Sequence, residues 1–492
     1  MLLMRDAFKK ISLAFVGFGL LSLTMVSCIN DPLDGGSFES DVTNTTLTSP
    51  SADKIELTAS PDGSQTTITW PVVHGASGYL CSVYDVTNPD APVVIDGVEN
   101  KLVDGCSIVI SRTEDTNYKF SILAVGNVDL NNKDAETATE VAFTTFVPAY
   151  ATLPSGTDLY KYFQDNPLPT DAKEELPIDL ESGGQYTVSG NIDFQGCKVT
   201  LRCTNKYNRP TVTYTENGGI STSAPMTIKN VLFNCAASDN AVISLSKTPV
   251  ESIKGATGKG DYYNIMGALY ISNCEFKGVN AQFIYDNNVK YCVENVLIDN
   301  TLVELTTTQS SGVSSNAIIF FKSGFANTLN VKNSTFYNTG AGGSDAKYFC
   351  QYNNSGRCDR AGYTTNYVMF QNCTFYNIAK AGQWCNYGGY NGKKTSAWVI
   401  TNNIFVDCGN GQVPRRIMGG RGMSAYDANL CKFGNNTYWF DGAPETGAAD
   451  YDAGNILTTN PNFRDAAHAI FTPQGEEQAA LQTGDPRWYL VN

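Results

Sequence analysis

The clearest pattern in the chain is a repeat of a short apolar segment, an asparagine and, three residues after the asparagine, an aromatic or aliphatic residue. The intervals run from 22 residues (273 to 295) to 43 residues (230 to 273). Spacing of this kind, with one strand-like core per unit, is typical of a solenoid. We expect the aromatic positions to stack from coil to coil and the asparagines to form a ladder of side-chain amides. The copies are NVLF at 230, NCEF at 273, NVLI at 295, NSTF at 333, NCTF at 372, NNIF at 402 and NNTY at 435.

A second pattern covers residues 54–146, where polar and apolar residues alternate over short stretches. Trp70 lies in one stretch, Tyr79 in the next, and Tyr118 and Phe120 in a later one. Short alternating strands at this spacing predict a β-sandwich with Trp70 in its core. The early tryptophan, the Gly-Tyr pair after a turn and the late Tyr-x-Phe-x-Ile strand resemble a fibronectin type III domain. That resemblance implies a spacer or a binding platform.

The segment between these two regions has helical spacing. Leu159, Tyr162 and Phe163 follow the i, i+3, i+4 pattern of one helix face. We expect a short helix here that caps the open end of the solenoid.

The N-terminus carries a signal for export. Basic residues precede an apolar run that ends in MVSC, residues 25–28. The run reads as a secretory signal and is too short to cross a bilayer comfortably. Its end resembles the lipobox of bacterial lipoproteins, which implies cleavage before Cys28 and lipidation of the Cys28 thiol; the alternative is an ordinary signal peptide. Residues 29–50 are polar and aperiodic, and they predict a flexible tether.

The lipobox, the fibronectin-like module, the asparagine coils and the closing GDPRW (484–488) together resemble pectate-lyase-like β-helix lipoproteins of Gram-negative polysaccharide-utilisation systems. The resemblance implies an outer-membrane, cell-surface location, glycan handling and partnership with an outer-membrane glycan transport complex. The expected fold is all-β, a fibronectin type III-like β-sandwich followed by a right-handed parallel β-helix, a single-stranded solenoid. The expected domains are a signal peptide (1–27), a lipidated tether (28–52), the fibronectin type III-like domain (53–148) and the β-helix with its cap helix (149–492).

Charge and composition limit the chemistry. The 34 Lys+Arg and 48 Asp+Glu give a net charge of −14, which argues against nucleic acid as a partner because phosphate binding needs a basic surface. The chain has only two histidines, His74 and His468, and no His/Cys cluster, so we predict no zinc site and no cofactor. Of the 14 cysteines, 13 remain if Cys28 is lipidated, and export permits disulfides among them. Cys350 and Cys358 could close one loop, but the pairing is open.

Residues 341–432 depart from this acidic balance, with ten basic and four acidic residues. Aromatic residues lie beside them on segments that we expect to be loops, at 340–366, 382–396 and 407–429. Arginine matches a carboxylate with two hydrogen bonds, and aromatic faces cover the apolar faces of sugar rings. We therefore expect a surface for an acidic, pectin-like uronic-acid glycan; in the alternative, the arginines pair with nearby aspartates or cap loop carbonyls. The predicted site residues are Lys347, Tyr348, Arg357, Arg360, Trp384, Tyr387, Tyr390, Lys393, Arg415, Arg416 and Arg421.

Glycan binding is the favoured function, ahead of a divergent polysaccharide lyase acting by β-elimination and of a structural or adhesive protein. Lyases of this fold hold Ca²⁺ with clustered carboxylates, yet the chain has no Asp-Asp pair, and a hydrolase would need paired acids. We therefore predict no catalytic residue and no metal. Ca²⁺ is expected only if the protein is a polysaccharide lyase. A carboxylate trio on the loops would favour the lyase, an exposed aromatic strip beside arginines would favour binding, and buried aromatics would favour the structural alternative.

Overall fold

The computed structural model describes residues 42–255, 261–306, 317–339, 346–353, 362–387, 390 and 393–490. The predicted signal peptide, the lipidation site Cys28 and the site residues Arg357 and Arg360 lie outside these ranges. The chain divides into two compact units, one with residues up to 83, 94–111 and 120–141, the other with 84–93, 112–119 and 142–492. In the described ranges, no helix combines the length and the apolar character needed to cross a membrane.

The N-terminal strands form two sheets, with strand orders β1-β2-β6 and β4-β3-β7-β8, and β5 pairs with β3. The ring of Trp70, which directly follows β2, lies 5.5 Å from Tyr79 of β3 and 5.7 Å from Phe120 of β7. Trp70 is therefore a core residue, as predicted, while membership of the fibronectin type III family stays a prediction. The strands are β1 (Glu56–Ala59), β2 (Gln65–Thr69), β3 (Ala76–Asp85), β4 (Val93–Val94), β5 (Lys101–Val103), β6 (Ser107–Ser111), β7 (Asn117–Gly126) and β8 (Thr139–Thr144).

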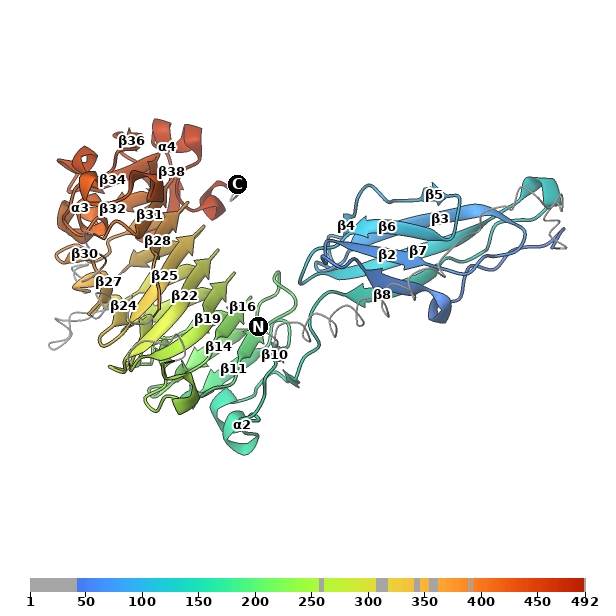
Figure 1. The fold of residues 1–492 in the computed structure, drawn as a ribbon. Coiled ribbons are helices and arrows are strands. Elements are labelled where there is room, and N and C mark those ends of the chain that lie inside the picture. The colour runs from blue at the N-terminus through green and yellow to red at the C-terminus, as the bar shows by residue number, and fades with distance from the viewer. Residues whose placement is uncertain are drawn as a thin grey trace, which may run out of the picture. The chain divides into compact units, whose positions relative to one another are not determined.

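The C-terminal part is a right-handed parallel β-helix whose coils follow one another in chain order (Figure 1). Each full coil gives one strand to each of three sheets. The first sheet contains β9 (Ala151–Leu153), β10 (Leu176–Leu180), β13 (Val199–Arg202), β16 (Met226–Lys229), β19 (Tyr263–Ser272), β22 (Tyr291–Asp299), β25 (Phe325–Lys332), β28 (Asn366–Gln371), β31 (Ser396–Thr401) and β33 (Cys431–Gly434). The second contains β11 (Gln185–Val188), β14 (Thr211–Tyr214), β17 (Leu232–Asn234), β20 (Glu275–Val279), β23 (Leu302–Leu305), β26 (Thr335–Asn338), β29 (Thr374–Tyr376), β32 (Ile404–Val406), β34 (Asn436–Phe440), β35 (Ala443–Pro444) and β36 (Ile456–Leu457). The third contains β12 (Asn191–Asp193), β15 (Gly219–Thr222), β18 (Ile243–Leu245), β21 (Ile284–Tyr285), β24 (Ala317–Phe321), β27 (Tyr348–Tyr352) and β30 (Gln383–Asn386).

The predicted asparagine ladder lies at the turn from the first sheet to the second. Six of the seven motif asparagines have left-handed backbone, with φ between 50 and 58°, a conformation that asparagine tolerates better than most residues. Hydrogen bonds between side-chain amides join successive members: Asn372 donates to Asn333 (3.1 Å), and Asn402 donates to Asn372 (3.0 Å). The seventh assignment is wrong: Asn295 lies within β22, and the ladder residue of that coil is Asn300 (φ 45°). The pattern NVLI matched the strand itself instead of the turn after it.

Aromatic side chains stack behind the ladder, as the repeat predicts. Phe233 lies 4.7 Å from Phe276, and Phe375 lies 5.0 Å from Phe405 with nearly parallel rings. Every cysteine that the structure describes is unbridged, and Cys358 lies outside the described residues. Cys274 and Cys373, next to the ladder, are fully buried, so they are packing residues as interpreted from the sequence.

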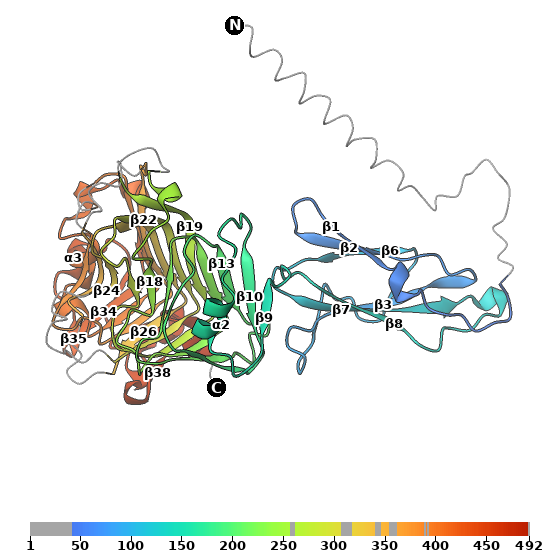
Figure 2. The same cartoon turned by 90° about the horizontal axis from the view of Figure 1, so that it is seen from below.

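The predicted cap helix is α2 (Leu159–Asp165), and Figure 2 shows it beside the first strands of the solenoid. Asp158 accepts a hydrogen bond from the backbone N–H of Tyr160 and so caps the helix N-terminus. Leu159 and Phe163 are buried in the solenoid core, and the Phe163 ring lies 5.2 Å from Phe194. The helix therefore closes one end of the apolar core.

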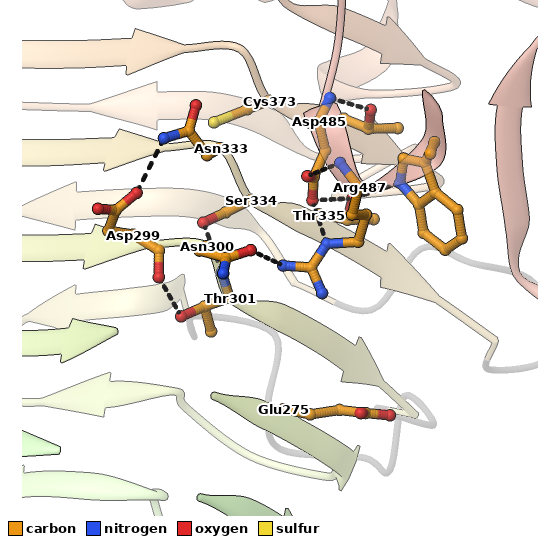
Figure 3. A network of polar contacts seen from close by, with 12 residues as sticks. Glu275, Asp299, Asn300, Thr301, Asn333, Ser334, Thr335, Cys373, Asp485 and Arg487 are labelled. Carbon is orange, nitrogen blue, oxygen red and sulfur yellow. Dashed lines mark hydrogen bonds and ion pairs between the residues drawn. The ribbon is translucent and has the colours of Figure 1, made fainter. Parts of the chain in front are cut away.

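The other end of the chain folds back over the second sheet. β37 (Phe463–Asp465) and β38 (Ile470–Pro473) form a hairpin, α4 (Glu476–Leu481) follows, and residues 484–489 then reach the outer face of the second sheet. We call residues 484–489 the C-terminal clasp. The Asp485 carboxylate accepts hydrogen bonds from Thr335 of β26 (2.8 Å) and from Nε of Arg487 (2.6 Å), as Figure 3 shows. The indole N–H of Trp488 donates to the same Thr335 hydroxyl (2.8 Å).

The clasp also alters the asparagine ladder. Arg487 donates to Oδ1 of Asn300 (3.1 Å), the atom that an ordinary ladder would offer to Asn333. Asn333 donates instead to Asp299 (3.0 Å; Figure 3). The closing GDPRW thus has a structural role that its sequence alone did not indicate.

Candidate functional site

The three segments expected to be loops contain regular structure. β27 lies in 340–366, β30 lies in 382–396, and α3 (Val413–Ile417) lies in 407–429. The sequence pattern detects the first-sheet and second-sheet strands of each coil but misses the short third-sheet strand. Tyr348 and Trp384, predicted on loops, therefore lie on third-sheet strands.

Three predicted sugar-stacking aromatics are instead core residues. Trp384, Tyr387 and Tyr390 have no exposed surface. The Trp384 ring lies parallel to that of Phe349 at 4.5 Å, and the Tyr390 hydroxyl donates to the Ala326 carbonyl. The prediction that these three rings stack on a sugar is wrong, because they fill the interior at the third-sheet corner of the coils.

Tyr348 belongs to a small aromatic cluster outside the main core. It packs with Phe320, and Phe320 stacks on Tyr285 at 5.7 Å. Tyr348 is only 7% exposed and Phe320 only 5%, whereas Tyr285 is half-buried. The Lys347 ammonium lies 5.7 Å from the centroid of the Tyr348 ring, within the range of a cation–π contact.

Lys347 and Arg416, predicted from distant parts of the sequence, line one cavity of about 200 Å³. We call it the cationic cavity; its lining includes Gly382, Gln383 and Gln412. Gly382 is required there, because a Cβ atom would lie 2.5 Å from the Lys347 carbonyl oxygen.

No described carboxylate pairs with either cation of the cationic cavity. Salt bridges elsewhere in the described residues involve other cations, such as Lys380 with Asp407. The Arg416 Nε atom is buried and has no hydrogen-bond partner in the described part of the chain. Two cations lining one cavity in this way favour an anion between them.

Arg415 points to a different cavity, although it is adjacent to Arg416. Its side chain donates to Gln412 (3.3 Å) and lines a space of about 330 Å³ with Glu445 and Asp450. The Glu445 carboxylate accepts the N–H of Val413 (3.0 Å), and burial raises its pKa to about 8. Arg415 and Arg416, which were predicted to act together, therefore line two different cavities from adjacent positions of α3.

Two further predicted cations do not line the cationic cavity. Arg421 is exposed in the turn after α3, and Lys393 is half-buried before β31. Arg357 and Arg360 lie outside the described residues. Of the nine predicted site residues that the structure describes, Lys347 and Arg416 line this cavity and the other seven do not.

A further cavity of about 680 Å³ is lined in part by Tyr160 of the cap helix, and the sequence patterns did not predict it. We call it the polar groove; Tyr160 and Tyr285 are among its lining residues. Small polar residues occupy the outward positions of the third-sheet strands here. Because those strands were not predicted, this row of residues did not indicate a groove. No group of three His, Cys, Asp or Glu side chains that could hold a metal ion occurs in the described ranges.

Three protein-family models match the chain, each described as a domain of unknown function: DUF4992 over residues 2–182, DUF4957 over 184–339 and DUF5123 over 368–488. No curated protein matches the sequence.

Similar solved structures are remote. A PL6 family alginate lyase, AlyGC, is 13% identical with a TM-score of 0.27, and the match covers 61% of this chain and 35% of the lyase. Pectate lyase PelI from Erwinia chrysanthemi, in complex with tetragalacturonic acid, is 13% identical with a TM-score of 0.16 over 65% of this chain and 84% of its own. A family 28 exopolygalacturonase from Yersinia enterocolitica is 9% identical with a TM-score of 0.19 over 74% of this chain and 80% of its own. The chain thus spans about a third of the length of the alginate lyase, and the function must be argued from the site itself.

Proposed function

We propose that this protein binds an acidic, uronic-acid polysaccharide, with sugar carboxylates held in the cationic cavity. The observation that carries the proposal is that Lys347 and Arg416 line one cavity without a described carboxylate partner. Arginine can bind a carboxylate through two parallel hydrogen bonds, and lysine adds a point charge. The amides of Gln383 and Gln412 supply donors and acceptors for neighbouring sugar hydroxyls.

The acidic body makes this cavity selective. The whole chain carries −14, so a polyanion is repelled from most of the surface and attracted to one local site. The buried aromatics meet the condition stated for the structural alternative, so the binding proposal rests on the two cations alone. With Trp384 buried, recognition at this cavity uses charge and hydrogen bonds and not ring stacking.

Removing the two cations should abolish most of the affinity. We expect Lys347→Ala combined with Arg416→Gln to weaken binding of polygalacturonate or alginate about 100-fold, because each charge-assisted hydrogen bond contributes about 1.5–3 kcal/mol. Affinity electrophoresis and isothermal titration calorimetry at fixed ionic strength would measure the change. Arg421→Gln is the matched control, since it removes one positive charge from an exposed position outside the cavity.

Equal losses in Arg416→Gln and Arg421→Gln would show non-specific attraction and contradict the proposal. Failure of the wild-type protein to bind any acidic polysaccharide would leave the structural or adhesive alternative. Appearance of unsaturated products, detected by their ultraviolet absorbance during the same titration with Ca²⁺ present, would identify a lyase.

We further propose that the protein is a lipoprotein of the outer membrane, anchored at the cell surface through Cys28 and holding glycan near a transport complex. The support is the sequence of residues 5–28 alone. Cys28→Ala should abolish incorporation of labelled fatty acid and move the protein from the membrane fraction to the soluble fraction. Cys106→Ala is the control; retention of label in Cys28→Ala would contradict the anchor.

A further inference from the structure

The polar groove arises from a change of side-chain size along the third sheet. Outward positions pair in register from Ser221 to Ser244 and from Ser244 to Tyr285. The two serines are small and form the floor, where they are joined by a hydrogen bond of 2.8 Å. The Tyr285 ring on the next strand forms one wall, and Tyr160 of α2 forms the other. Large residues on either side of small ones leave a hollow of about 680 Å³.

Both ends of the groove are fixed by packing. The Tyr160 ring lies against Gly190, where a Cβ atom would come within 2.9 Å of three ring carbons. At the other end, Tyr285 stacks on Phe320 at 5.7 Å with an interplanar angle of 20°. The two half-buried rings are therefore held in place before any ligand arrives, which lowers the entropic cost of binding.

The lining between the rings offers unused polar groups. The side chains of Asp239, Lys247 and Gln282 make no hydrogen bond or ion pair with any other described residue. The Asp193 carboxylate, in contrast, already accepts from Ser246 (2.5 Å) and Gln195 (2.8 Å). A mixture of amide, carboxylate and ammonium groups both donates and accepts, as adjacent sugar hydroxyls require.

The charge of the groove distinguishes it from the cationic cavity. Asp193 and Asp239 outnumber Lys247, so the groove does not attract a polyanion. Its mostly polar lining does not suit a lipid chain either, since buried polar groups would lose their hydrogen bonds. The two tyrosine rings can stack on the pyranose rings of an uncharged sugar, and the polar groups between them can form hydrogen bonds with its hydroxyls.

We propose that the polar groove is a second glycan site, which binds a neutral oligosaccharide independently of the cationic cavity. Three strand-to-strand steps separate β12 from β21, roughly 14 Å along the solenoid axis, so the site takes more than a single sugar ring. Tyr160 and Tyr285 stack on the sugar faces, and Asp239, Lys247 and Gln282 bind hydroxyls.

The test is calorimetric titration of the whole protein with gluco-, manno- and galacto-oligosaccharides. We expect one of them to bind the wild-type protein and to bind Tyr285→Ala about tenfold more weakly or worse. Tyr207→Ala is the matched control, because Tyr207 is 59% exposed on the solenoid outside the groove. Lys247→Ala is the second variant; its side chain is exposed, so a loss of binding in it does not reflect misfolding.

The same titrations test the cationic cavity and the polar groove independently of each other. Arg416→Gln should weaken acidic polysaccharide while leaving the neutral ligand unaffected, and Tyr285→Ala should do the reverse. The second site is overturned if no neutral oligosaccharide of the panel binds, or if binding survives in both Tyr285→Ala and Lys247→Ala. It is also overturned if Tyr285→Ala weakens acidic polysaccharide as strongly as Arg416→Gln does, because groove and cavity would then form one site for an acidic chain.

Discussion

Replacing Trp384 with alanine is expected to lower the free energy of unfolding by about 3–5 kcal/mol, because the change removes a fully buried indole from the solenoid core. The ring contacts Phe349 at 4.5 Å and Phe375 at 4.9 Å, so its loss leaves a cavity between coils. Urea unfolding followed by circular dichroism would measure the change. At temperatures where the variant is folded, its affinity for acidic polysaccharide should equal that of the wild-type protein.

Trp439→Ala provides the matched control. Trp439 is half-buried on β34, so its removal should cost clearly less than that of Trp384. If Trp384→Ala kept full stability and lost polysaccharide binding, Trp384 would be a contact residue after all, and the core assignment would be wrong.

Replacing Asp485 with alanine is the second change with a large expected effect. The Asp485 side chain is 1% exposed and holds Thr335 and Arg487 together. Removing one member of a buried ion pair leaves the charge of the other member uncompensated, which typically lowers the free energy of unfolding by about 3–5 kcal/mol. Because Arg487 is partly exposed, we expect about 3 kcal/mol.

The clasp can be tested further with a double-mutant cycle. Once Asp485 is replaced, Arg487→Ala should cost much less than it does in the wild-type background, since the two side chains act as a pair. Asp450→Ala, at an exposed position, should change stability little. Additive losses from Asp485 and Arg487 would contradict the pairing.

The sequence predicted the solenoid because its determinants are local. An asparagine in left-handed conformation and an inward aromatic three residues later recur in six coils, so a short pattern identifies them. Asn295 shows the limit of that pattern: the letters match, but the residue lies in the strand, and Asn300 makes the turn. A ladder residue is defined by its backbone conformation, which a four-residue pattern does not specify.

The sequence predicted only part of the site. Lys347 follows Asn333 by 14 residues (347 − 333), and Arg416 follows Asn402 by 14 (416 − 402), and the two line the same cavity. Trp384 was misassigned because third-sheet strands are only two to five residues long, and such short strands resemble loops in sequence. The polar groove depends on the register of neighbouring coils whose residues lie far apart in the sequence, which a single sequence does not reveal.

The C-terminal clasp changes how the solenoid responds to stress. In a stacked array each coil contacts only its neighbours, so unfolding can begin at an end and proceed one coil at a time. Thr335 and Asp485 are 150 residues apart, and their contact ties an interior coil to the last segment of the chain. The terminal coil cannot unfold without breaking the contact to that interior coil, so the part of the array from β26 to the clasp, which includes the cationic cavity, should open in one cooperative step.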